Sequence, residues 1–132
     1  MKRFFAFFLS LAVSATLFLT SCASSTGLTG NYRQDTLMLI DSLRTAIELP
    51  ESTPDKSAAQ TDARAKINDF VSRYRRDPSI TGLNSFLTMT TALNGLAAHY
   101  SSYPNRPIPD KLHKRLDQEF KSVEIALDRE SA

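Results

Sequence analysis

The chain has 132 residues, with 16 lysines and arginines against 14 aspartates and glutamates, so its formal net charge at pH 7 is +2. A nucleic-acid-binding domain needs a clear basic surplus, and this near balance argues against one. Hydrophobic residues make up 42% of the chain and glycine occurs only 4 times, which is typical of a folded domain and argues against disorder.

The first residues have the layout of a secretory signal. Lys2 and Arg3 precede a mostly apolar run over residues 4–19, which is shorter than the roughly 20 residues that a membrane-spanning helix needs. Cys22 follows this run and is the only cysteine, so it can form no internal disulfide and no multi-cysteine zinc site. Residues 19–22, LTSC, resemble a bacterial lipobox, which implies a diacylglyceryl group on Cys22 and cleavage before it. The alternative is an ordinary signal peptide with a chance cysteine.

These features predict three parts: a lipoprotein signal peptide (1–21), a lipidated flexible tether (22–30) and a helical domain (31–132). Cleavage leaves 132 − 21 = 111 residues, enough for one domain, and removes Lys2 and Arg3, so 14 basic and 14 acidic side chains remain. Residues 23–30, ASSTGLTG, have the composition of a linker that reaches at most about 28 Å. Two or three acyl chains would hold the protein on a membrane without a spanning helix.

Two helical segments are predicted in the first half of the domain. The first begins at Asn31, a capping residue with Gln34 three positions later, and ends near Pro50. Its apolar residues recur every three or four positions: Leu37, Ile40, Leu43 and Ile47. The second begins near Thr53 and is expected to stop at Asp77 and Pro78. Its stripe consists of Ala59, Ala63, Ile67, Phe70, Val71 and Tyr74.

Two further helical segments follow. The third has a broad apolar arc that contains Leu83, Phe86, Leu87, Thr90, Leu93, Leu96, Ala97 and Tyr100. It ends at SSYPNRPIP, where three prolines within residues 104–109 favour a stiff, extended loop. The fourth starts near Asp110, and its stripe consists of Leu112, Leu116, Phe120, Val123 and Leu127. Four such helices can share one core when they stack antiparallel, so the sequence predicts an all-α, up-down-up-down four-helix bundle of undetermined handedness.

No pattern of catalytic or metal-binding residues is found. His99 and His113 are the only histidines, neither has a second ligand at metal-site spacing, and we interpret both as surface or helix-end residues. The chain has no glycine-rich phosphate loop and no serine in a nucleophile elbow. We therefore expect no enzyme activity, no cofactor and no metal.

Two polar stretches are candidates for partner binding. SRYRRDPS places Arg73, Arg75 and Arg76 around a helix end, where the helix dipole alone would favour a cation, but three arginines could also bind carboxylates. In SSYPNRPIP, the residues Tyr103, Asn105 and Arg106 form the second candidate, because aromatic and arginine side chains are enriched at interface hot spots. The alternative is that this stretch only connects two helices.

Four stretches of the domain carry a resemblance to a known family. They are LTGNYRQDT (28–36), INDFVSRYRRDPSITGLNSF (67–86), TALNGLAAHYSSYPNRPIP (91–109) and RLDQEFKSVEIAL (115–127). Together they resemble the small luminal lipoprotein family of photosystem II assembly and repair, and the lipobox resembles that of its cyanobacterial branch.

The resemblance implies a non-enzymatic, monomeric four-helix bundle that is anchored by lipid on the luminal side of the thylakoid membrane. Its implied partner is the photosystem II core, chiefly the large luminal loop of the inner antenna subunit. Binding there is expected to be transient and to keep the extrinsic subunits off while the manganese cluster is assembled. The alternative is a helical-bundle lipoprotein of the cell envelope with another protein partner.

Overall fold

The computed structural model describes residues 26–103 and 106–131. In these residues four long helices and one single-turn helix are present, and no strand is found. The helices are α2 (Tyr32–Glu48), α3 (Asp55–Tyr74), α4 (Pro78–Thr81), α5 (Asn84–Ser102) and α6 (Asp110–Glu130). The prediction of an all-α four-helix bundle is confirmed.

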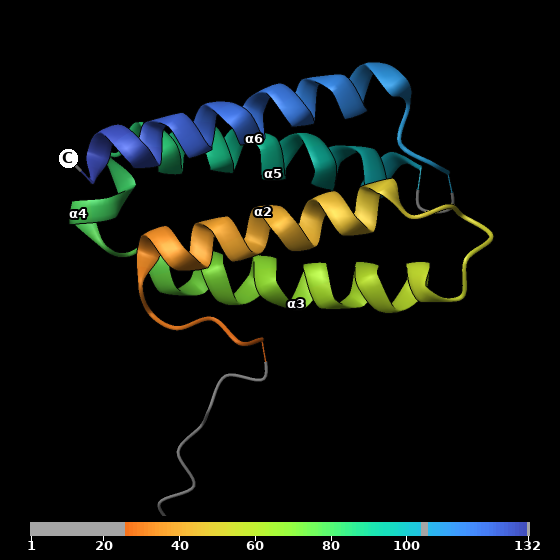
Figure 1. The fold of residues 1–132 in the computed structure, drawn as a ribbon, viewed down its shortest axis with the longest axis horizontal. Helices are drawn as coiled ribbons and strands as arrows, with labels where there is room; N and C mark the ends of the chain where they lie inside the picture. The colour runs from red at the N-terminus through yellow and green to blue at the C-terminus, as the bar shows by residue number, and fades with distance from the viewer. Residues whose placement is uncertain (1–25, 104–105, 132) are drawn as a thin grey trace, which may run out of the picture.

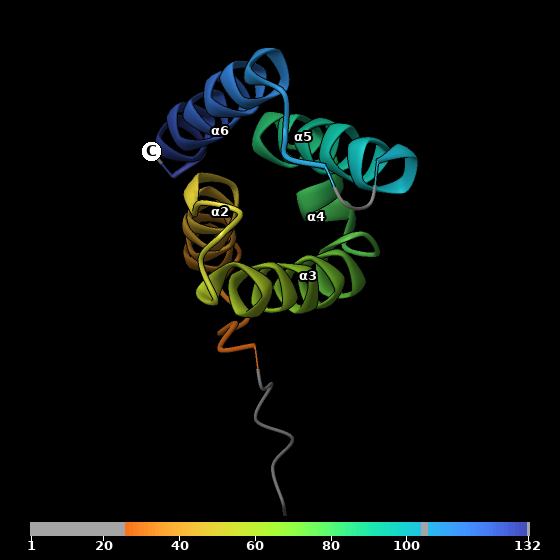
Figure 2. The same cartoon turned by 90° about the vertical axis from the view of Figure 1, so that its right-hand side faces the viewer.

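The four long helices run antiparallel along one common direction (Figure 1). α2 packs along α3, α5 packs along α6, and α2 and α6 meet between these two pairs. Seen from the end, the helices surround one core (Figure 2). Among the neighbouring long helices, α3 and α5 make the least contact with each other. The α3–α5 side is therefore the open side of the bundle.

The helix ends follow from local side-chain chemistry. Asn31 caps α2 as predicted, because its side-chain oxygen accepts a hydrogen bond from the Gln34 backbone N–H at 3.0 Å. The prediction for Pro78 was wrong in part. α3 already ends at Tyr74, and Pro78 begins the single turn α4, where Asp77 accepts a hydrogen bond from the Ser79 N–H at 2.9 Å. Proline is favoured at this first helical position, because its missing N–H would have no partner there.

Residues from all four long helices form one core. The largest fully buried side chains in it are those of Phe70, Phe120, Leu39, Ile40, Leu43, Met89, Leu116 and Leu127. Three residues of the predicted apolar stripes are exposed: Leu37 (37%), Leu87 (53%) and Ala97. In α2, Leu39 is buried in place of Leu37, which shifts the buried face around the helix.

A carboxylate from the end of the chain caps α5. The residue before this helix, Leu83, has no side chain that can accept a hydrogen bond. Glu130 of α6 accepts one from the Ser85 N–H at 3.0 Å and another from the Ser85 hydroxyl. The Tyr32 hydroxyl lies 2.8 Å from the same Ser85 oxygen. This contact joins α2, α5 and α6 at one end of the bundle.

Candidate functional site

The three arginines of the first predicted patch have different environments. Arg73 forms two hydrogen bonds with Asp69 one turn earlier, from Nε at 2.7 Å and from a terminal nitrogen at 3.2 Å. The Asp69 carboxylate that accepts these bonds raises the pKa of Arg73. Arg75 and Arg76 are exposed, and neither forms an ion pair among residues 26–103 and 106–131. Arg73 is thus held within the bundle, whereas Arg75 and Arg76 are accessible to a partner.

The second predicted patch is a small cluster at the end of α5. The Arg106 guanidinium lies 5.9 Å from the centre of the Tyr103 ring, and Tyr103 is 51% exposed. His99 supports both, because its ring centre is 5.7 Å from that of Tyr103 and its Nε2 is 3.2 Å from the Arg106 carbonyl oxygen. Asn105 lies outside the described residues. Tyr103 and Arg106 form an exposed pair of the kind found at interface hot spots.

The helix-end position predicted for His99 is confirmed. It lies near the end of α5 as expected, but it is buried, with 8% of its surface exposed. Arg106, which precedes α6, supplies the carbonyl oxygen that the His99 ring contacts. His113 lies in the first turns of α6, half-buried, with Nδ1 3.3 Å from Asp117.

The two patches are not parts of one site. Arg75 and Arg76 follow α3, and Tyr103 and Arg106 follow α5, so they lie at opposite ends of the bundle (Figure 1). The 19 residues of α5 separate them by about 28 Å along the bundle axis. A partner that contacts both would have to extend along the whole length of a helix.

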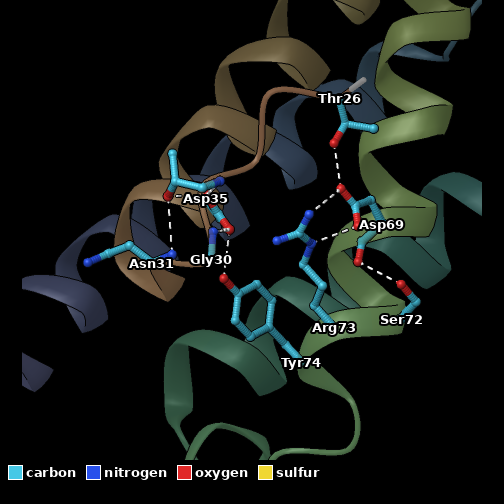
Figure 3. A network of polar contacts seen from close by, with 9 residues as sticks. Thr26, Gly30, Asn31, Asp35, Asp69, Ser72, Arg73 and Tyr74 are labelled. Carbon is cyan, nitrogen blue, oxygen red and sulfur yellow. Dashed lines mark hydrogen bonds and ion pairs between the residues drawn. The ribbon is translucent and has the colours of Figure 1, made fainter. Parts of the chain in front are cut away.

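A polar network that the sequence patterns did not reveal holds residues 26–30, the segment before α2, on the bundle (Figure 3). Asp35 has no exposed surface. It accepts hydrogen bonds from the Thr29 N–H at 2.6 Å, the Thr29 hydroxyl at 2.8 Å, the Gly30 N–H at 2.9 Å and the Tyr74 hydroxyl at 2.6 Å. Gly30 has φ 89°, a left-handed conformation that glycine adopts without strain. Asp35 thus fixes the segment to both α2 and α3.

The environment of this carboxylate changes two pKa values. Burial alone would raise the pKa of Asp35, but the hydrogen bonds from Tyr74, Thr29 and Gly30 outweigh it, and the pKa is lowered. Burial and the bond to Asp35 raise the pKa of Tyr74. At neutral pH, therefore, an ionised Asp35 accepts from a protonated Tyr74.

The segment before α2 follows the surface of α3. The Thr26 hydroxyl donates to Asp69, the residue that also pairs with Arg73 (Figure 3). Leu28 is buried against the core. Residues 26–30, which the composition suggested to be a linker, therefore pack on the bundle, and Thr26 lies beside α3.

Comparisons with known proteins identify the family. The model of the family described as Photosystem II Pbs27 matches residues 3–127. The chain is 64% identical over 132 residues to the "Photosystem II assembly factor lipoprotein Psb27" of Thermosynechococcus vestitus, covering 99% of this chain and 98% of that protein. It is 33% identical over 129 residues to the "Photosystem II repair protein PSB27-H1, chloroplastic" of Arabidopsis thaliana, covering 92% of this chain and 74% of that one.

A solved structure agrees with this result. The fold matches the "Solution Structure of Psb27 from cyanobacterial photosystem II" with a TM-score of 0.73 and 56% sequence identity, over 84% of this chain and 96% of that one. The family resemblance of the four sequence stretches is thereby confirmed. This chain belongs to the Photosystem II Pbs27 family.

Proposed function

We propose that this protein is a non-enzymatic factor in the assembly and repair of photosystem II. The observation that carries the proposal is the family match over residues 3–127 together with relatives whose names describe assembly and repair of this complex. The architecture supports it, because a small bundle with exposed arginine and tyrosine side chains is suited to binding another protein.

The proposed role needs no chemistry on the part of this chain. In residues 26–103 and 106–131, no three His, Cys, Asp or Glu side chains are placed so that they could hold a metal ion. The buried Asp35 and His99 are engaged in contacts that hold the chain together. We therefore propose binding, and no reaction, as the function.

The proposed location is the luminal side of the thylakoid membrane, with a lipid anchor on Cys22. Cys22 lies outside the described residues, and relatives named as lipoproteins support the anchor. No helix in the described part of the chain is long and apolar enough to cross a membrane. Thr26 is four residues after Cys22, so the lipid would lie within about 14 Å of Thr26 beside α3.

Replacing the cysteine tests the anchor. Cys22→Ser should move the protein from the membrane fraction to the soluble luminal fraction, because the acyl chains that hold it are lost. The measurement is fractionation after a carbonate wash, with circular dichroism to check that helix content is unchanged. A variant that stays on the membrane would contradict the lipid anchor.

The proposed partner is the photosystem II core, chiefly the luminal loop of the inner antenna subunit, bound by a monomer. Tyr103, Asn105 and Arg106 are the proposed contact residues, and Arg75 and Arg76 would make a separate contact at the other end. We propose that the bound protein keeps the extrinsic subunits off while the manganese cluster is assembled. Arg73 is left out of the contact surface because it pairs with Asp69.

Charge reversal at the connector tests this contact. Arg106→Glu should weaken binding more than Arg106→Ala, because it replaces an attraction by a repulsion while the melting temperature stays nearly unchanged. Retention of the purified variants on photosystem II cores that lack extrinsic subunits is the measurement. Higher salt should weaken the wild type as well.

Lys121→Glu is the matched control, because Lys121 is exposed on α6 and the change in charge is the same. It should be retained like the wild type. Equal retention of the wild type, Arg106→Ala and Arg106→Glu at low salt would remove this connector from the interface.

A further inference from the structure

The open side of the bundle contains an apolar cleft. It has a volume of about 360 Å³ and lies where α2, α3 and α5 meet, at the lower end of the range for ligand pockets. Its walls include Leu43 and Ile47 from α2, Ala63 and Ile67 from α3, and Leu93 and Leu96 from α5. Protein interiors are normally close-packed, and larger side chains in place of Ala63 or Ala97 would fill this space. The cleft therefore offers room for an apolar group from outside.

The helix that forms one wall of this cleft has no charged side chain. α5 reads NSFLTMTTALNGLAAHYSS, without any Asp, Glu, Lys or Arg, in a chain of which 23% is charged. Its exposed positions between the two ends carry only small, amide or apolar side chains: Leu87, Thr91, Asn94, Ala97, Ala98 and Ser101. The apolar residue Leu87 has 53% of its surface exposed. Depletion of charge is what distinguishes the centre of a protein interface from other surface.

One arginine lines the cleft itself. Arg64 of α3 lines the cleft, is exposed, and forms no ion pair within the described residues. Gln60 and Asn68 lie one turn before and one turn after Arg64 on α3, and both also line the cleft with uncharged amide groups. An apolar cleft with one accessible guanidinium at its edge is complementary to an apolar side chain that has a carboxylate near it.

The position of the cleft leaves it accessible in the anchored protein. Thr26 contacts Asp69, which is five positions after Arg64 and so about 140° around α3. The segment that leads to the membrane therefore follows a different side of α3. At its other end the cleft is lined by Tyr100 and Ser101, close in sequence to Tyr103 and Arg106. The cleft therefore ends near the part of the chain that carries this exposed pair.

We propose that the α3–α5 cleft and the uncharged side of α5 form the central docking surface for a protein segment that inserts an apolar side chain and places a carboxylate on Arg64. The inference rests on the proposed function, because the segment belongs to the photosystem II core. It assigns the centre of the interface to this cleft and places Tyr103 and Arg106 at the edge of the interface. Arg75 and Arg76 would make the separate contact at the other end of the bundle.

The test is retention of full-length lipidated variants on detergent-solubilised photosystem II cores that lack extrinsic subunits. Ala97→Glu should bind at least about tenfold more weakly, because its carboxylate would stand in the cleft and compete with the carboxylate of the incoming segment for Arg64. The matched control is Ala65→Glu, the same change at an exposed alanine of α3 that does not line the cleft. It should bind within about twofold of the wild type. Arg64→Glu should bind more weakly than Arg64→Ala, and all four variants should keep the wild-type melting temperature within a few degrees.

The outcomes separate this inference from the function on which it rests. Equal retention of the wild type, Ala97→Glu and Arg64→Glu would overturn the docking surface and leave the function standing. No retention of the wild type would overturn both. A wild-type dimer that Ala97→Glu converts to monomers, with retention unchanged, would assign the surface to a second copy of this chain. The wild type could instead bind palmitate saturably, and Ala97→Glu alone among the variants could abolish this binding while retention on photosystem II stays unchanged. That result would assign the cleft to a small apolar ligand. Either result overturns the proposal.

Discussion

Phe70→Ala should lower the free energy of unfolding by about 3–5 kcal/mol, the usual cost of removing a buried phenylalanine ring. Phe70 is 1% exposed and lies in the centre of an aromatic cluster. Its ring centre is 5.0 Å from that of Tyr74, 6.1 Å from that of Tyr32 and 6.3 Å from that of Phe86. These rings come from α2, α3 and α5, so the truncation loosens three helices together.

Urea denaturation followed by far-ultraviolet circular dichroism measures this loss. Leu87→Ala is the control, because the side chain is also large and apolar but is 53% exposed, and it should cost no more than about 0.5 kcal/mol. Domains of this kind are stable by about 5–15 kcal/mol, so the loss at Phe70 is a large fraction of the total. A loss below about 1 kcal/mol at Phe70 would contradict the packing described for this cluster.

Asp35→Asn should lower the free energy of unfolding at neutral pH by about 3 kcal/mol. The carboxylate accepts four hydrogen bonds, and an amide of the same shape brings two N–H groups to a site where every neighbour is a donor. Tyr74→Phe removes only one of the four bonds and should cost about half as much. Equal stability of the wild type and Asp35→Asn would contradict the role of this network.

The pH dependence of stability in the wild type and in Asp35→Asn gives a second test of this network. The pKa of Asp35 is lowered from 3.8 in the folded chain, so its contribution is complete above the unfolded value and is lost as the pH falls through the folded value. The wild type should therefore lose more stability than Asp35→Asn between about pH 5 and pH 2. Parallel pH profiles for the two proteins would show that Asp35 does not titrate as described.

The helices could be predicted because their signals are local. Apolar residues at every third or fourth position mark all four, and Asn31 caps α2 as its sequence position suggests. The side of α2 that is buried was predicted less well. Leu37 and Leu39 are about 160° apart around the helix, on either side of Ile40, and only packing against α3 and α6 decides which of them is buried. His99 illustrates the same limit, since its burial depends on the fold of the connector that follows α5.

The candidate site was harder to predict because its contacts join distant residues. Asp35 and Tyr74 are 39 positions apart in the sequence, and Ser85 and Glu130 are 45 apart. No short sequence pattern could therefore predict either contact. Arg73 is the exception. Its partner Asp69 is one turn earlier on the same helix, a spacing from which this ion pair could have been predicted, although the sequence pattern was interpreted as placing Arg73 in a partner-binding patch. The arrangement of the bundle alone shows that the two patches lie a full helix length apart, with Tyr103 and Arg106 at one end and Arg75 and Arg76 at the other.

Recovery of the native complex tests the central claim most directly. The full-length protein with an affinity tag at its C-terminus is expressed in a cyanobacterium, the thylakoids are solubilised in mild detergent, and the proteins recovered with it are identified by mass spectrometry. We expect photosystem II core subunits, including the inner antenna subunit, without the extrinsic subunits. Recovery of envelope proteins without any photosystem II subunit would contradict the proposed function.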